Sequence, residues 1–276
     1  MLLSSKLHSY AHAIKAVEST RRAIAPQAST LDLTLESAMQ TLDALHTLNI
    51  AGGLDAVGRK VIAESCTRQS HHQTQACLGH HYASQTVYVQ DEELVLKTRN
   101  SARLFLQPKL VLKISQAPDI SVSLEHFTQM FESAALAIEI LQTPFTGNVW
   151  SFEDRVCSNG LGHQLAIGEA RTLSEKRKRN FSNVVHHAMF SVNRVSQKGS
   201  QLIDYASGAD IAMSSISELY EVFQRQWRIE GRSPFHQNDL ISLNALCAPV
   251  KVTAGEEYAC VASGVDLGSI RIRFAQ

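Results

Sequence analysis

The spacing of apolar residues changes once along this chain of 276 residues, and that change limits the folds it can adopt. In the first fifty residues, apolar side chains recur at steps of three and four, which predicts amphipathic helices over residues 3–17 and 35–45. Thr34 is a suitable N-cap for the second helix, and Gly52 stops it. From about residue 57 onward, short apolar runs alternate with polar residues, which is typical of strands.

Two of the predicted strands carry charged residues on one face. The strand over residues 109–114 has its leucines and isoleucine on one face, and two lysines and a valine on the other. The strand over residues 136–141 aims Glu139 away from the face that carries its isoleucines. A strongly amphipathic helix is predicted over residues 216–227, and further strands follow it. Helices at the front and in the middle, with strands between and after them, favour an α+β fold.

The predicted organisation is a helical amino-terminal arm, residues 1–55, and a β-rich unit, residues 56–276. The chain has 26 Lys and Arg against 26 Asp and Glu, a balance that argues against nucleic acid or an anionic membrane as a partner. We find no secretory signal and no apolar run long enough to span a membrane, so we expect a cytoplasmic protein. Five cysteines without a Cys-x-x-Cys pair favour reduced thiols.

A cluster of cysteines and histidines lies between residues 66 and 81. Its members are Cys66, His71, His72, Cys77, His80 and His81. Thiolate and imidazole are ligands that zinc prefers, so a tetrahedral site is one interpretation. The spacing is not that of a known zinc module, and adjacent histidines in a strand point to opposite faces. The other interpretation is a polar surface loop.

Two further segments are interpreted as ordinary loops. Ser158-Asn159-Gly160-Leu161-Gly162 places its serine before the glycines, so it lacks the spacing of a nucleophile elbow and indicates a glycine-rich turn. The basic run at residues 176–179 is explained by an exposed loop.

Four segments resemble a known family in the same order along the chain. They are Gly58-Arg59-Lys60 after a predicted helix, Gln107-Pro108-Lys109-Leu110, Ala137-Ile138-Glu139-Ile140, and a closing segment over residues 239–256. In this order they resemble the 2-keto-4-pentenoate hydratase and 4-oxalocrotonate decarboxylase family. The resemblance implies the fumarylacetoacetate hydrolase fold, with a mixed, strongly bent β-sheet, and an assembly of at least two subunits.

The resemblance also implies a damaged metal site. In that family, the strand after the matching proline carries Glu-x-Glu, and a third glutamate joins these carboxylates around a divalent metal that polarises a 2-oxo acid. The matching residues here are Val111 and Lys113, and the third position is Glu139. A hard cation needs oxygen ligands, and one carboxylate beside an ammonium is a poor substitute. We therefore expect no metal and no other cofactor, with Lys113 paired to Glu139 in place of the cation.

These matches suggest roles for individual residues. Lys60 and Lys113 would stabilise an oxyanion or a carboxylate, and Glu139 would move a proton. Polar groups expected to contact the substrate are Ser158, Asn159 and Asn244. The alternatives are that Lys60 is a rim lysine and that Glu139 only neutralises Lys113.

Two functions remain open from the sequence. The first is a metal-independent lyase or isomerase that acts on a small 2-oxo acid or β-dicarbonyl compound, and it requires an open cavity reached by Lys60, Lys113 and Glu139. The second is a catalytically inactive subunit that supports or regulates a partner enzyme of the hydratase family. The expected partners are therefore a small oxo acid and a second subunit, either a copy of this chain or a related one.

Overall fold

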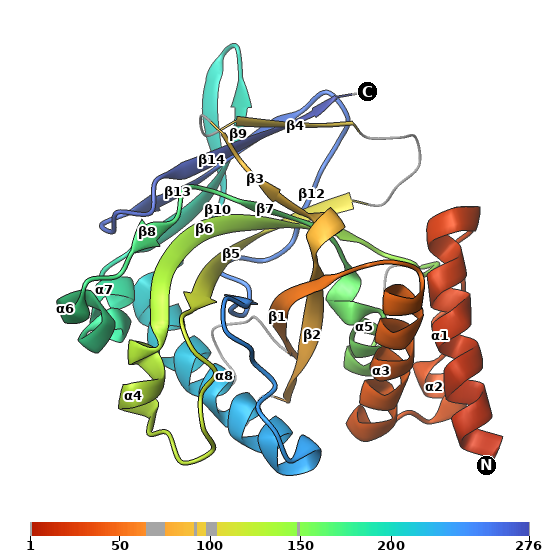
Figure 1. The fold of residues 1–276 in the computed structure, drawn as a ribbon. Helices are drawn as coiled ribbons and strands as arrows, with labels where there is room; N and C mark the ends of the chain where they lie inside the picture. Colours follow the sequence, from red (N-terminus) through yellow and green to blue (C-terminus); the bar gives the residue numbers. More distant parts are fainter. Residues whose placement is uncertain (1, 65–74, 91–92, 98–103, 148–149, 276) are drawn as a thin grey trace.

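The computed structural model describes residues 2–64, 75–90, 93–97, 104–147 and 150–275, and it confirms the α+β prediction (Figure 1). The amino-terminal arm consists of helices α1 (Leu2–Thr20), α2 (Ala28–Leu31) and α3 (Leu35–Ala51). Thr34 caps α3 as predicted, because its hydroxyl accepts from the Ser37 amide and the Ser37 hydroxyl in turn accepts from the Thr34 amide. This reciprocal pair fixes the point at which α3 begins.

The carboxylate of Asp154 ties the arm to the rest of the chain. Asp154 lies in helix α5 (Phe152–Cys157), and its Oδ1 accepts from the Tyr10 hydroxyl at 2.7 Å. The same oxygen accepts from the amides of Gln27 and Ala28, at 3.0 Å each. Burial and the Asp154 carboxylate both raise the pKa of the Tyr10 hydroxyl, which therefore stays protonated and donates. Figure 1 shows α1, α3 and α5 gathered beside β1 and β2.

The larger sheet supplies the framework for the site described below. Its strands are β1 (Ala56–Ala63), β2 (Ala76–Tyr82), β3 (Thr86–Tyr88), β5 (Leu104–Ile114), β6 (Phe131–Gln142), β7 (Gly162–Ile167), β8 (Arg171–Thr172), β11 (Leu240–Ser242) and β12 (Val250–Lys251). The order is β2-β1-β11-β5-β6-β7-β3, with β12 beside β5 and β8 beside β6. β1 runs parallel to β11, whereas β5 is antiparallel to both β11 and β6, so the sheet is mixed.

A second sheet packs near the carboxyl terminus. Its order is β10-β9-β13-β14-β4, and its strands are β4 (Glu93–Lys97), β9 (Met189–Ser196), β10 (Gly199–Ser207), β13 (Glu257–Ser263) and β14 (Ser269–Ala275). The remaining elements are α4 (Leu124–Gln129), α6 (Glu175–Arg179), α7 (Phe181–His186), α8 (Gly208–Glu230) and the short 3-10 helices η1 (Ala83–Gln85) and η2 (Asn159–Leu161).

Separate apolar clusters cover the faces of the larger sheet. The main core joins the strands to α8, whose Leu219 and Phe223 are fully buried. A second cluster joins the arm and α5 to Ile62, Cys77 and other residues of the sheet. Burial of these apolar faces is the main driving force that holds the arm and α8 in place. No helix in the described part of the chain is both long and apolar enough to cross a membrane.

The loop interpretation is wrong for the basic run and for the described part of the cysteine and histidine cluster. Residues 77–81 lie within the buried strand β2 and not in a surface loop. The basic run forms most of the short helix α6, whose first turn is capped by Ser174. The glycine-rich turn is confirmed, because Gly160 within η2 adopts a left-handed φ of 66°.

Candidate functional site

Strand β1 presents neighbouring side chains to opposite faces of the sheet. Gly58 allows β1 to lie close to β11, since a Cβ there would stand 1.9 Å from the Leu240 carbonyl oxygen. After Gly58, Lys60 and Ile62 point to the face covered by the arm. Arg59 and Val61 point to the opposite face. The two faces are therefore chemically distinct.

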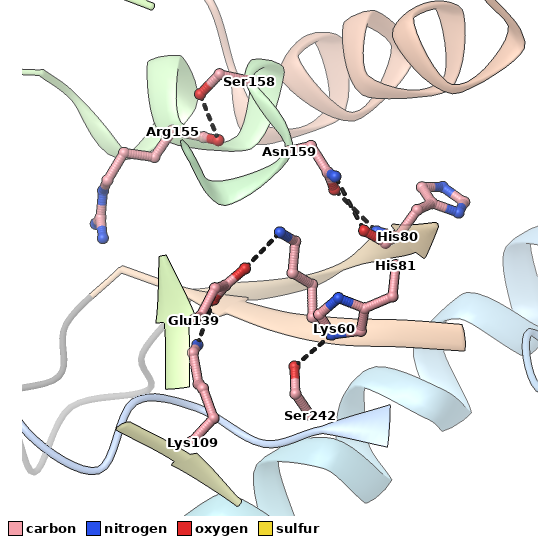
Figure 2. A network of polar contacts seen from close by, with 9 residues as sticks. All are labelled: Lys60, His80, His81, Lys109, Glu139, Arg155, Ser158, Asn159 and Ser242. Atoms are coloured by element: carbon pink, nitrogen blue, oxygen red, sulfur yellow. Dashed lines mark hydrogen bonds and ion pairs between the residues drawn. The ribbon is translucent and has the colours of Figure 1, made fainter. Parts of the chain in front are cut away.

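Lys60, Lys109 and Glu139 form a buried group that we call the ion cluster (Figure 2). The Lys60 ammonium donates to Glu139 Oε1 at 2.7 Å, and Lys109 Nζ lies 3.3 Å from Oε2. Lys109 on β5 is opposite Ala137 on β6, so Glu139 is its diagonal neighbour on the same face. Lys60 reaches Glu139 from the other side, because the sheet curls and both side chains are long.

The predicted pairing of Lys113 with Glu139 is wrong. Lys113 lies opposite Ser133, which is six residues or roughly 20 Å along β6 from Glu139. Its ammonium instead pairs with Glu132 at 2.6 Å, in a position where both side chains are more than a third exposed. The sequence prediction had the correct strand face, but the lysine that contacts Glu139 lies four residues earlier.

The residues beside Glu139 do not suit a divalent metal. The nearest positions of β5 on its face are Gln107, directly opposite it, and Lys109. Gln107 is buried and its amide lies 3.4 Å from the Cys247 carbonyl oxygen. A single carboxylate already bound by two ammonium groups leaves no negative charge for a cation. No group of three His, Cys, Asp or Glu side chains with metal-binding geometry occurs among the described residues.

His81 and Ser242 complete the polar lining around the ion cluster. His81 Nε2 lies 2.8 Å from the Ser242 hydroxyl, and Figure 2 shows its ring next to Lys60. Burial, together with the nearby ammonium groups, lowers the pKa of His81 to about 3. The imidazole is therefore neutral at physiological pH, and it can exchange a hydrogen bond with the serine.

Burial and ion pairing have opposing effects on the charges of the ion cluster. Burial opposes ionisation of Glu139, but the ammonium groups of Lys60 and Lys109 outweigh it and hold the pKa of that carboxyl at about 2. Burial lowers the pKa of Lys60, and Glu139 partly offsets this effect. Two ammonium groups and one carboxylate leave one excess positive charge. Glu218 on α8 also interacts electrostatically with Lys109. Burial and Glu221 raise the pKa of Glu218 to about 7, so its carboxylate neutralises the excess positive charge only in part.

The three predicted substrate-binding residues make structural hydrogen bonds. The Ser158 hydroxyl lies within hydrogen-bond distance of the carbonyl oxygens of Asp154 and Arg155, at the end of α5. The Asn159 amide bonds both to the backbone N–H and to the carbonyl of His80, at 2.8 and 3.0 Å. Asn244 Oδ1 accepts from the Ala245 amide at 2.8 Å, and its side chain also bonds to Glu218. None of these hydrogen bonds is made to the ion cluster.

Among the described residues, the predicted zinc ligands do not form a common site. Cys66, His71 and His72 lie outside the described residues. Cys77 is buried on the face of β2 that contacts the arm, and burial raises the pKa of its thiol to about 12. His80 and His81 point to opposite faces of β2, as Figure 2 shows.

The ion cluster is closed to solvent in this structure. The side chains of Lys60, Lys109 and Glu139 are each at most 5% exposed, so the open cavity expected for an enzyme is not present around them. A Cβ at Gly162 would stand 2.0 Å from Lys60 Nζ, and one at Gly79 would contact the Lys60 side chain at 3.2 Å. A cavity of about 560 Å³ lies on the other side of Gly162, lined also by Asn159 and His163.

Comparison with known proteins places this arrangement in a known fold. No family model and no curated protein sequence matches the chain. Among solved structures, 4-oxalocrotonate decarboxylase from Pseudomonas putida G7, complexed with magnesium and adipate, matches over 98% of this chain and 97% of its own, with a TM-score of 0.80 and 14% identity. The chain has the fold of this decarboxylase.

A second match agrees with the first at lower similarity. Fumarylpyruvate hydrolase from Pseudomonas aeruginosa, in complex with Mn²⁺ and pyruvate, matches over 79% of this chain and 90% of its own, with a TM-score of 0.53 and 14% identity. The predicted fumarylacetoacetate hydrolase fold is thus confirmed, including the helical arm and the bent mixed sheet.

Sequence reasoning missed Lys109, Gln107 and His81 as neighbours of Glu139, and Ser242 as the partner of His81. The alternation of residues along the strand had already placed Lys109 on the charged face. The family resemblance, however, assigned the contact with Glu139 to Lys113, which lies four residues after Lys109. Pairing of Ser242 with His81 joins residues 161 positions apart, and no local signal marks it.

Proposed function

We propose that the protein is a metal-independent lyase-type or isomerase-type enzyme that acts on a small 2-oxo acid or β-dicarbonyl compound. The observation that supports it is the excess positive charge of the ion cluster. A buried charge is costly unless a partner compensates it, so a cluster with a purely structural task is expected to be balanced. A substrate carboxylate or enolate would supply the missing negative charge.

The ion cluster supplies the groups that such a reaction needs. When the carbon–carbon bond between a carboxylate and the carbon next to a ketone breaks, CO2 leaves, and the electron pair of that bond moves onto the ketone oxygen and forms an enolate. Lys109 would hold that oxygen by electrostatic attraction in place of a metal. Lys60, whose pKa is lowered, would return a proton to carbon, and Glu139 would hold both ammonium groups in position.

Access to the ion cluster is proposed to run past Gly162. This residue lines the cavity of about 560 Å³ on one side and contacts Lys60 and Glu139 on the other. Glycine places no side chain between the cavity and these two residues. A substrate in the cavity would reach the cluster after a small displacement of the η2 and β7 backbone.

The test is turnover by the full chain in EDTA. Purified protein would be given 4-oxalocrotonate, fumarylpyruvate and oxaloacetate, and loss of absorbance or release of CO2 would be followed with and without added Mg²⁺. We expect activity that survives EDTA and falls at least about 100-fold in Lys109→Met. The control is Lys113→Met, which removes an exposed lysine from the same strand face and should leave the rate unchanged.

A second candidate function is a catalytically inactive subunit. The observation that favours it is the closure of the ion cluster, in which Glu139 pairs both ammonium groups and all three side chains are buried. In that case, no substrate of this class would turn over, and the chain would co-purify with a homologue that carries the full set of metal-binding glutamates. A stable homo-oligomer that is active by itself would contradict this alternative.

A further inference from the structure

The face of β1 and β2 opposite the ion cluster borders a large cavity. It has a volume of about 960 Å³ and lies between α3, α8 and the segment 232–239. We call it the α3/α8 cavity. Its lining includes Met39, His46, Arg59, His80, Ile229 and Glu230. Cavities of this size hold small organic ligands in many proteins.

Two buried nitrogen atoms in the wall of the α3/α8 cavity have no hydrogen-bond partner among the described residues. Arg59 Nε is shielded from solvent, and no described residue accepts a hydrogen bond from it. His80 is only 5% exposed, and its Nε2 likewise has no hydrogen-bond partner in the described part of the chain. Buried donors without acceptors are rare, because each costs about 1–3 kcal/mol. Arg59 and His80 are cross-strand partners on the same face, so one ligand can reach both.

The position of His80 is held by its neighbours. His46 of α3 stacks on it, with ring centroids 3.6 Å apart and planes inclined by 6°. Asn159 fixes the His80 backbone from the opposite face, and Figure 2 shows the imidazole turned away from Lys60 and Glu139. Burial lowers the pKa of both histidines, so their rings are neutral and Nε2 can donate a hydrogen bond in one tautomer.

The charges of the α3/α8 cavity select against ligands with several negative charges. Arg59, Arg225 and Arg232 line it together with four carboxylates, Glu36, Asp43, Glu230 and Asp239. Glu230 accepts from the Gln226 amide at 2.5 Å, and Asp239 accepts from the His236 backbone at 2.7 Å. Glu230, Asp43 and Asp239 interact with Arg59 electrostatically. A phosphate or dicarboxylate would meet more repulsion from these acids than a single carboxylate would.

We propose that the α3/α8 cavity binds a small monocarboxylate with an apolar body. The carboxylate would accept from Arg59 and from His80 Nε2, in a charge-assisted arrangement that an arginine favours. The apolar body would lie against Leu35, Met39 and Ile229, which also line the cavity. This site is separate from the proposed catalytic one, because β1 and β2 lie between them.

The experiment is calorimetric titration of the full chain with sodium benzoate. We expect saturable binding of one benzoate per chain, with benzamide at least about tenfold weaker and inorganic phosphate unable to compete. Arg59→Gln should weaken benzoate at least about tenfold, because it removes the charge and keeps much of the side-chain volume. Absence of saturable binding at about 10 mM benzoate would overturn the proposal.

Further variants keep the test decisive if Arg59→Gln does not fold. Ile229→Glu changes a residue that is 66% exposed at the rim, so the fold should tolerate it, and its negative charge should also weaken benzoate. Arg177→Gln on α6 is the matched control for loss of an arginine and should bind as the unaltered protein does. Lys109→Met should also bind normally, whereas a loss there would move the benzoate to the ion cluster and contradict the proposal.

Discussion

The two faces of the β1 and β2 pair treat buried charge in different ways. On the face covered by the arm, Lys60 is joined to Glu139 and is almost fully buried. On the other face, the next residue, Arg59, borders a cavity and its Nε has no partner in the described part of the chain. Adjacent residues of one strand thus carry a paired cation and an unpaired one.

This difference separates a charge that stabilises the fold from one that is kept for a ligand. The ammonium of Lys60 is held by a carboxylate, and removal of that carboxylate leaves an uncompensated charge. The Nε of Arg59 has no hydrogen-bond partner in the described part of the chain, and burial lowers the pKa of Arg59 more than the nearby acids raise it. Its removal should therefore cost the folded state little. The following predictions test this contrast, beginning with the largest effect.

Glu139→Gln should destabilise the protein by about 3–5 kcal/mol, because two buried ammonium groups lose the carboxylate that pairs with both of them. Urea unfolding followed by circular dichroism measures this change. Glu132→Gln is the control, since it breaks the exposed pair with Lys113 and should cost about 0–1 kcal/mol. If both variants lose the same stability, burial of the ion cluster has no energetic consequence and the contrast fails.

A double variant tests whether charge balance is the cause. Glu139→Gln combined with Lys109→Met leaves one buried ammonium in place of two, so it should recover part of the stability lost in Glu139→Gln. If the loss of stability in the double variant equals the sum of the losses in the two single variants, the two residues act independently and charge balance is not the cause.

His81→Gln should flatten the dependence of stability on pH between about pH 6.5 and 4. The folded His81 stays neutral down to a pKa of about 3, whereas the unfolded chain takes up a proton near 6.5. The unfolded state therefore binds more protons in this window, and the free energy of unfolding falls by about 1 kcal/mol per pH unit on acidification. Denaturant titrations at several pH values should give a slope lower by about one proton in the variant.

Arg59→Met should change the free energy of unfolding by no more than about 1 kcal/mol in the absence of ligand. The variant removes a cation that has no described hydrogen-bond partner at Nε, and methionine keeps an apolar stem against the cavity wall. Thermal unfolding with and without benzoate provides the measurement. A loss of more than about 2 kcal/mol without ligand would show that Arg59 is a structural cation, as Lys60 is.

Local patterns predicted much of the fold. The spacing of apolar residues located α1, α3 and α8, and the cap at Thr34 and the turn at Gly160 have the predicted geometry. These features depend on residues close together in the sequence. Strand β2 was misread as a loop, because its histidines and Gly79 are polar or small, and only burial between α3, α8 and the sheet stabilises them there.

The candidate site could be predicted only in part. The alternation along β5 correctly identified the face that carries lysines, and Lys60 and Glu139 do meet. Which lysine contacts Glu139 depends on the register between β5 and β6, which is set by the packing of the whole sheet. The α3/α8 cavity forms where α3, α8 and the segment 232–239 pack together, and no local sequence pattern predicted it.

The contact between Tyr10 and Asp154 also sets an order of events during synthesis. The two residues are 144 positions apart, so at about 5–20 residues per second the ribosome adds the second about 7–30 s after the first. During that time α1 can already pack on α3, which follows it closely in the sequence, but it cannot yet bind α5. The two helices can therefore pair early and dock onto α5 late, and a chaperone that shields their shared apolar surface would act before the sheet is complete.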